Sequence, residues 1–271
     1  MNKHQIAEIV LKKLQDNHSI LKKDYHKFSK DIETKFFILD DIFPDNITKN
    51  IYEDFPKDIN QFKFRNTFRE KKFTFDKFDK LPKKIISETV EAFHLENIVN
   101  EISKITNILD LEPDPSLYGA GISRMDKTHF LNPHVDNSHD AKNQKYRRLN
   151  VLYYVTPDFN EEDGGNFELW DKNVKKNFKI QAKFNRLVVM EASRSAWHSV
   201  DSIKTYKKRC CLSNYYYSKN SPEEKNYYNV TSFTGRPNEK FKRFFGKIDN
   251  KLRQTFANMT GFTRGSKSNK D

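Results

Sequence analysis

The chain contains only two cysteines among its 271 residues, and they are adjacent: Cys210 and Cys211. Neighbouring side chains on a strand point to opposite faces, so this pair is badly placed for a structural disulfide. A secreted scaffold held together by disulfides is therefore disfavoured, and we expect a reduced, cytoplasmic protein.

Long hydrophobic runs are also missing. The beginning of the chain lacks a basic stretch followed by a continuous apolar segment, and its longest early apolar run is Ile9–Leu11. No stretch approaches the roughly 20 apolar residues that a membrane-spanning helix needs. We therefore expect neither a signal peptide nor a membrane partner.

A tight arginine stripe and a known nucleic-acid-binding module are absent as well, although the formal net charge is +12. Lysine greatly outnumbers arginine, and asparagine, isoleucine and phenylalanine are abundant. This mixture is typical of a lysine- and asparagine-rich coding bias and favours a solvated surface over a nucleic acid partner. A protein that binds or oxidises nucleic acid is kept as an alternative, which a steep salt dependence of affinity would support.

The first part of the chain, residues 1–111, is predicted to be a helical support region of a single domain that spans 1–271. Apolar residues recur there with helical spacing in several segments. The predicted helices cover 1–30, 44–55, 85–93 and 98–108. A short apolar run at 36–39 predicts a strand, and 55–81, which has no clear period, is predicted to be loop and edge strand.

From 112 to 218 the pattern changes to short β-rich runs separated by turn signals. The predicted strands cover 122–125, 149–155, 167–170, 187–190 and 210–217. The acidic, glycine-containing turn at 161–165 predicts a hairpin. We expect a mainly β fold with helical additions (α+β), whose core is a double-stranded β-helix, or jelly roll, with a mouth for metal and ligand.

The last part, 219–271, is predicted to be an extension with one amphipathic helix that ends near Gly261. Its apolar stripe consists of Phe241, Phe244, Phe245, Ile248, Leu252 and Phe256. We expect this stripe to pack against the barrel or against a second subunit, as in a homodimer. Residues 264–271 have the composition of a disordered basic tail.

The most informative motif is His134-Val135-Asp136, followed about sixty residues later by His198. On a strand, side chains at i and i+2 share one face, so His134 and Asp136 can converge on one point. With His198 they would make a 2-His-1-carboxylate set, which leaves coordination positions open, as non-heme Fe(II) oxygenases require. Three unrelated polar residues are the alternative.

Arg209 follows the second histidine by eleven residues. The guanidinium is planar and permanently charged, so it suits the far carboxylate of a dicarboxylic cosubstrate. Such an anchor would be superfluous in a non-catalytic metal-binding jelly roll, which is a further alternative.

Several runs together resemble the prolyl-4-hydroxylase-like superfamily of Fe(II)/2-oxoglutarate oxygenases, including the hypoxia-sensing prolyl hydroxylases and small bacterial and phage members. The matching segments are 114–121, 134–137, 151–155, 164–165, 183–190, 197–200 and Arg209. The resemblance is strong over 112–218 and loose over 35–110. It is specific to the superfamily but not to a substrate.

The resemblance implies that His134, Asp136 and His198 bind Fe(II) and that Arg209 and Tyr154 hold the C5 carboxylate of 2-oxoglutarate. A plain core aromatic is the alternative for Tyr154. O2 would be the second cosubstrate, ascorbate an optional reductant, and succinate and CO2 the coproducts. Related halogenases lack the carboxylate ligand, so the presence of Asp136 favours hydroxylation.

Other polar residues leave two interpretations open. Arg124 stands where these relatives place a tyrosine that faces the pocket, so it is either a substrate contact or a surface residue. Asn150 either supports the ligands or substrate, or belongs to the barrel wall. His129 and His139 are predicted to be loop residues, and Gly164-Gly165 to serve only the turn. The substrate is expected to be a prolyl or other protein side chain, or a small molecule.

Overall fold

The computed structural model describes residues 1–27, 29, 31–81, 84–114, 116–117, 120–223 and 225–260. Its helices are α1 (Lys3–Asp16), α2 (His18–Tyr25), α3 (Asp45–Glu53), α4 (Ile85–Ala92), α5 (Glu96–Thr106) and α6 (Lys240–Thr260). Short 3-10 turns lie at Ile59–Gln61, Phe78–Lys80 and Glu161–Asp163.

The first strands are β1 (Phe36–Asp40), β2 (Lys63–Asn66), β3 (Glu70–Phe75), β4 (Glu112–Pro113), β5 (Gly121–Met125), β6 (Phe130–Val135) and β7 (Tyr146–Tyr154). The later strands are β8 (Phe167–Trp170), β9 (Asn177–Ile180), β10 (Arg186–Glu191), β11 (His198–Val200), β12 (Arg209–Ser218) and β13 (Ser232–Phe233).

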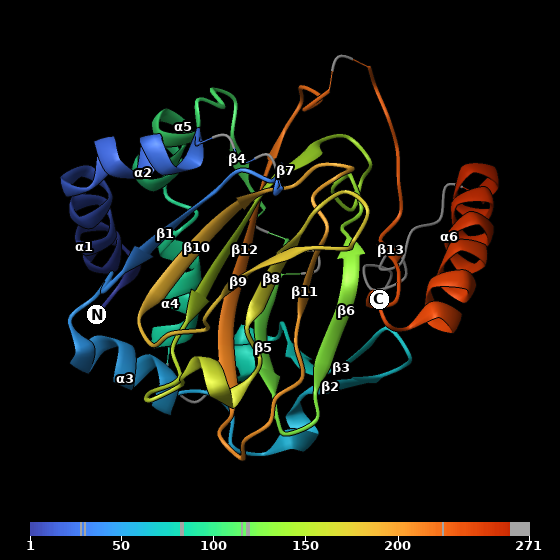
Figure 1. The fold of residues 1–271 in the computed structure, drawn as a ribbon. Coiled ribbons are helices and arrows are strands. Elements are labelled where there is room, and N and C mark those ends of the chain that lie inside the picture. Colours follow the sequence, from blue (N-terminus) through green and yellow to red (C-terminus); the bar gives the residue numbers. More distant parts are fainter. Residues whose placement is uncertain are drawn as a thin grey trace.

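All of these strands belong to one antiparallel sheet in the order β1-β10-β7-β12-β5-β3-β6-β11-β8-β9. Beside this path, β13 pairs with β6, β2 with β3 and β4 with β12. The sheet curls into a half-barrel of two arms, and the N-terminal helices cover the outer side of the arm that contains β1, β10, β7 and β12 (Figure 1). This arrangement confirms the predicted jelly roll with helical additions.

The strands separate two cores because neighbouring residues on a strand point to opposite faces. On β12, Cys210 and Leu212 pack into the core shared with the helices. Cys211, between them, packs into the interior of the half-barrel with Tyr154 and Met190. Residues of odd number at the start of β12, Arg209 among them, therefore face the interior in which a site can form.

The helix predicted over 1–30 is two helices. α1 ends at Asp16 and α2 begins at His18, with Asn17 between them. The Asn17 side chain donates a hydrogen bond to the carbonyl of Lys13, 2.9 Å away, and so competes with the helical backbone pattern. The apolar residues of α1 that the pattern identified, Ile6, Val10 and Leu14, are buried as expected.

Two predictions of strand pairing are wrong. β3, in the segment predicted as loop and edge strand, lies inside the sheet and pairs with both β5 and β6. The turn at 161–165 closes no hairpin, because β7 pairs with β10 and β12 whereas β8 pairs with β9 and β11. This segment instead crosses from one arm of the sheet to the other.

The apolar stripe of the C-terminal helix does not pack against the barrel, which was one of the two placements predicted for it. α6 lies beside β13 at the edge of the molecule (Figure 1), but its apolar stripe points to solvent, with Phe241 84% and Leu252 66% exposed. Its polar side faces the protein, since Asn250 and Arg253 bond to the backbone of β13 and its neighbour Thr231. Hydrogen bonding to an otherwise unpaired backbone decides the orientation. Gly261 and the tail at 264–271 lie outside the described residues.

Among the described helices, none combines the length and the apolar character that a bilayer crossing requires.

Candidate metal centre

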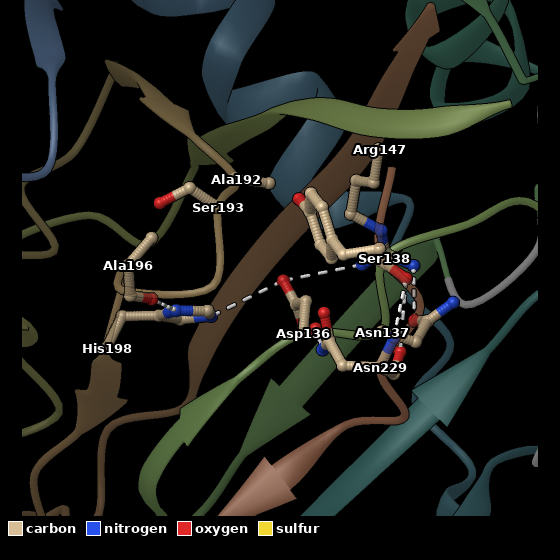
Figure 2. Close-up of a pocket in the computed structure, with 10 residues that line it drawn as sticks. Asp136, Asn137, Ser138, Arg147, Ala192, Ser193, Ala196, His198 and Asn229 are labelled. Atoms are coloured by element: carbon tan, nitrogen blue, oxygen red, sulfur yellow. Dashed lines mark hydrogen bonds and ion pairs between the residues drawn. The ribbon is translucent and has the colours of Figure 1, made fainter. Parts of the chain in front are cut away.

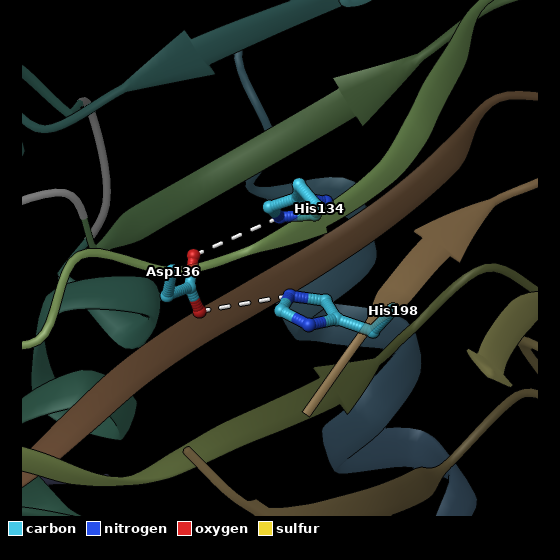
Figure 3. Close-up of side chains that lie close together, drawn as sticks. All are labelled: His134, Asp136 and His198. Atoms are coloured by element: carbon cyan, nitrogen blue, oxygen red, sulfur yellow. Dashed lines mark ion pairs between the residues drawn. The ribbon is translucent and has the colours of Figure 1, made fainter. Parts of the chain in front are cut away.

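The two histidines and the aspartate of the sequence motif meet inside the half-barrel. β6 carries His134 and is followed at once by Asp136, and the antiparallel pairing of β11 with β6 places His198 opposite His134. The candidate ligand atoms of all three residues lie within 4.8 Å of one another. Figure 3 shows both imidazoles turned toward the carboxylate.

Hydrogen bonds fix the protonation of both imidazoles. Nδ1 of His134 lies 3.0 Å from the carbonyl of Asn132, and Nδ1 of His198 lies 2.9 Å from the carbonyl of Ala196. A carbonyl accepts only, so each Nδ1 carries the proton and each Nε2 keeps its lone pair. The Nε2 atoms face Asp136, at 3.7 Å from Oδ1 for His134 and 3.6 Å from Oδ2 for His198. This is the tautomer that metal-binding histidines use.

The surroundings keep His134 and Asp136 in the charge states that bind a cation. Loss of hydration lowers the pKa of His134 to about 3, so its imidazole is neutral at physiological pH. Burial alone would raise the pKa of Asp136, but the positive charge of Arg147 and the proximity of the two histidines hold it well below its usual range. Two imidazoles and one carboxylate make up the donor set, which suits Fe(II).

Arg147 and Asn150 support the carboxylate from β7. Asn150 donates a 2.7 Å hydrogen bond to Oδ2 of Asp136, and Arg147 lies 3.4 Å from the same oxygen. Arg147 also lies over the ring of Tyr215, at 3.9 Å from its centroid. Asn150 was predicted either to support the ligands or substrate or to belong to the barrel wall. In the structure it contacts the candidate ligand Asp136. Arg147 was missed because nothing in the sequence tells which of Arg147 and Arg148 faces inward.

Arg209 lies in the same interior, at the start of β12, and is 4% exposed. Its Nε donates to the carbonyl of Gly165, 2.6 Å away, and its guanidinium lies 4.8 Å from the ring centroid of Tyr154. Within the described part of the chain, no carboxylate forms an ion pair with it. A buried cation of this kind is unfavourable unless an anion joins it.

Tyr154 presents a second unsatisfied group beside Arg209. Its hydroxyl is buried and has no hydrogen-bond partner among the described residues. Burial raises its pKa well above the ordinary value, although the charge of Arg209 acts in the opposite direction, so the phenol keeps its proton. Arg209 and Tyr154 together offer hydrogen-bond donors to one carboxylate.

Gly165 was predicted to serve only the turn, but in the structure it also makes room for Arg209. Its φ is +68°, and a Cβ built on it would lie 2.9 Å from Cδ of Arg209 and 2.2 Å from Cδ1 of Ile203. The missing side chain therefore makes room for the arginine whose Nε the Gly165 carbonyl binds. A glycine next to a predicted turn gave no signal of this second constraint.

The opening beside Asp136 and His198 has polar walls (Figure 2). The other residues that line it are Asn137, Ser138, Arg147, Ala192, Ser193, Ala196, Tyr227 and Asn229. Asn229 comes from the segment before β13 and donates a 2.8 Å hydrogen bond to the backbone carbonyl of Asp136. Amide and hydroxyl groups therefore lie close to the candidate ligands at this opening.

Phe233 of β13 completes the surroundings of His134. Its ring stacks on the imidazole with centroids 5.0 Å apart and planes inclined by 14°. Asn250 of α6 holds Phe233 by two backbone hydrogen bonds, of 2.9 and 2.8 Å. Sequence reasoning missed this contact because a strand of two residues has no recognisable period.

Three other residues singled out in the sequence lie away from this cluster. Met125 of β5 pairs with Arg209, and Arg124, the residue before it, points to the opposite face of the strand. Arg124 donates two 2.8 Å hydrogen bonds to the carboxylate of Asp126. His129 packs against phenylalanine rings, and His139 against Tyr146. The structure gives none of these three side chains a contact with the candidate ligands.

Comparisons with known proteins agree with this site. Residues 120–217 match the model of the 2OG-Fe(II) oxygenase superfamily, which confirms the resemblance found in the sequence. No curated protein matched the sequence. The fold is similar to that of a prolyl 4-hydroxylase from Phytophthora capsici, at 17% identity and a TM-score of 0.55, over 92% of this chain and 75% of the other.

Two further solved structures share the fold. One is a prolyl hydroxylase from Trichoplax adhaerens in complex with a peptide fragment of the hypoxia inducible factor oxygen degradation domain, at 17% identity and a TM-score of 0.52, over 76% of this chain and 92% of the other. The other is a prolyl-4-hydroxylase from Pseudomonas putida, at 11% identity and a TM-score of 0.50, over 73% and 99%.

Proposed function

We propose that the core of this chain is a 2OG-Fe(II) oxygenase domain in which His134, Asp136 and His198 hold iron while Arg209 and Tyr154 hold 2-oxoglutarate. The enzyme is a dioxygenase that depends on Fe(II) and 2-oxoglutarate. When bound, iron, 2-oxoglutarate and O2 supply the oxidising power for an unactivated C–H bond, with succinate and CO2 as coproducts.

The observation that carries the cosubstrate assignment is the pair of unsatisfied groups in the interior. A buried guanidinium without a carboxylate and a buried phenol without a partner are each costly, and one carboxylate satisfies both. A purely structural metal site has no use for such a pair. This supports an enzyme over a non-catalytic metal-binding module.

The protein's own groups prepare the metal site before anything binds. The two backbone carbonyls that accept from Nδ1 orient the imidazoles, and Asn150 and Arg147 orient the carboxylate of Asp136. Asp136 as a third ligand fills the position that halide takes in related halogenases. We therefore propose hydroxylation as the reaction.

For the substrate we propose a prolyl or other side chain of a peptide, and keep a small molecule as the alternative. The opening beside Asp136 and His198 supports this by its place next to the proposed iron ligands. The prolyl hydroxylases that share the fold point in the same direction.

The first test is Fe(II)-dependent formation of succinate from 2-oxoglutarate, with and without a library of proline-containing peptides and small metabolites. We expect His198→Ala and Asp136→Ala to abolish turnover and metal binding. The matched control is His129→Ala, which removes another buried imidazole but no candidate ligand. Wild-type turnover in either ligand variant would exclude the metal assignment.

A further inference from the structure

The outer face of α6 is apolar over the whole length of the helix. Its large side chains recur every three or four residues, so they share one side. They are Phe241, Phe244, Phe245, Ile248, Leu252, Phe256 and Met259, all between 45% and 84% exposed. Contiguous exposed apolar surface of this extent marks a place of interaction.

The inner face holds α6 in this orientation. Arg243 donates hydrogen bonds to the carbonyls of Asn173 and Val174, and Gln254 bonds to the backbone of Val230. Asn250 adds the two bonds to Phe233 described above. Turning the apolar side inward would break all of these bonds, so the exposure of the apolar face is part of the folded structure.

The flanks of this face are positively charged. Residues 240–260 contain six lysines and arginines, which are Lys240, Lys242, Arg243, Lys247, Lys251 and Arg253, and a single carboxylate, Asp249. That carboxylate is already paired with Arg69 and Arg253. Lys240, Lys247 and Lys251 are exposed and, from their spacing, lie along one flank of the apolar face.

From this combination we propose that α6 is an interfacial helix that docks the protein on an anionic lipid surface. Phenylalanine and leucine side chains on one face, with lysines along its edge, are the pattern of helices that lie in the plane of a bilayer. The aromatic side chains would enter the headgroup boundary while the lysines meet acidic headgroups. Such docking needs no membrane-spanning segment.

Charge disfavours a second copy of the chain as the occupant. Two α6 helices packed antiparallel through their apolar faces would bring their lysine-rich flanks together. In a parallel pair, each lysine-rich flank would meet the opposite flank of the other helix, which carries Lys242, Asp249 and Arg253. The carboxylate that could relieve this repulsion, Asp249, is occupied by arginines of its own chain. The formal net charge of +12 adds to the repulsion between copies and to the attraction of an anionic surface.

The test is sedimentation of the full chain with vesicles of phosphatidylcholine alone and with vesicles containing equal parts of phosphatidylserine. We expect binding to the second kind only. Phe245→Ser with Leu252→Ser should abolish it, and Lys247→Glu with Lys251→Glu should weaken it by more than about tenfold, because each lysine near an anionic surface contributes about fivefold. All four side chains are exposed, so the fold should remain intact, which circular dichroism checks.

The matched control reverses two exposed lysines on another helix, Lys22→Glu with Lys23→Glu, and changes the net charge equally. It should keep most of the binding if the charge next to the apolar face is what matters. No binding of the wild type to anionic vesicles would overturn the proposal. So would equal loss in both lysine pairs, or a dimer in sedimentation velocity that the Phe245→Ser/Leu252→Ser variant dissociates, since the face would then belong to a second copy.

Discussion

At the scale of single residues, the interior of the half-barrel contains a buried cation that forms no ion pair within the described chain and a buried hydroxyl beside it. Arg209 and Tyr154 lie 4.8 Å apart, guanidinium to ring centroid, and the bonds of Arg209 to the Gly165 carbonyl and the Met125 sulfur leave its charge uncompensated. A fold keeps such groups at a cost in stability. We propose that this free energy is recovered when the carboxylate of 2-oxoglutarate binds.

Arg209→Ala should therefore raise the 2-oxoglutarate requirement far more than Tyr154→Phe. Removing one partner of a buried charged pair costs about 2–5 kcal/mol, whereas one hydrogen bond to a charged group contributes about 1.5–3 kcal/mol. Titration of 2-oxoglutarate in the presence of Fe(II) measures both effects. Unchanged affinity in Arg209→Ala would exclude its role as the anchor.

Gly165→Ala should damage the site through Arg209. Its positive φ already strains an alanine, and the new methyl group would lie 2.9 Å from Cδ of Arg209. We expect weaker 2-oxoglutarate binding in addition to a lower melting temperature. If the variant loses stability but binds 2-oxoglutarate like the wild type, Gly165 serves the backbone alone.

At the scale of secondary-structure elements, the candidate metal centre is connected to α6, a helix far from it in the sequence. Asn250 holds the backbone of Phe233, and Phe233 stacks on His134. We therefore propose that the polar face of α6 supports one candidate ligand.

Asn250→Ala should lower the affinity for the metal by up to about tenfold, since groups behind a ligand typically contribute 10–100-fold and this one acts through an intervening ring. The control is Asn258→Ala, an exposed asparagine of the same helix. Titration with Co(II) under anaerobic conditions provides the readout. Equal affinities in the two variants would show that α6 does not support the site.

The elements also show what the sequence could reveal. His134 and Asp136 were predicted to converge because side chains two residues apart share a face. His198 was added from the ligand pattern and the family resemblance, and the pairing of β11 with β6 brings it to them. The pairing of the strands could not be predicted as well. The turn sequence at 161–165 is the same whether the turn closes a hairpin or connects the two arms of the sheet. The direction of α6 followed from backbone groups around Thr231 and Phe233 that need hydrogen-bond partners, and no periodicity records such a need.

At the scale of the whole molecule, burial of neutral histidines makes stability depend on pH. Burial lowers the pKa values of His94, His129, His134 and His139 below 6.5, that of His134 to about 3. The folded state therefore binds fewer protons than the unfolded chain at acidic pH. This contribution is complete above pH 6.5 and is lost progressively as the pH falls below that value.

We expect the free energy of unfolding of the metal-free protein to fall between neutral pH and about pH 5, before most carboxylates titrate. Denaturant titrations at several pH values test this. Stability that is constant down to the carboxylate range would show that these histidines are as easily protonated in the folded chain as in the unfolded one.

We also propose that the region from residue 134 to residue 233 acts as one unit, because segments far apart within it contribute to the centre. His134 and His198 face each other across β6 and β11, and Phe233 closes over the first of them from β13. During synthesis, a chain that has emerged only as far as His134 therefore has no complete metal site. Iron would bind only after about a hundred further residues have been synthesised and folded. Because it would bind the folded state alone, it would also stabilise that state against unfolding.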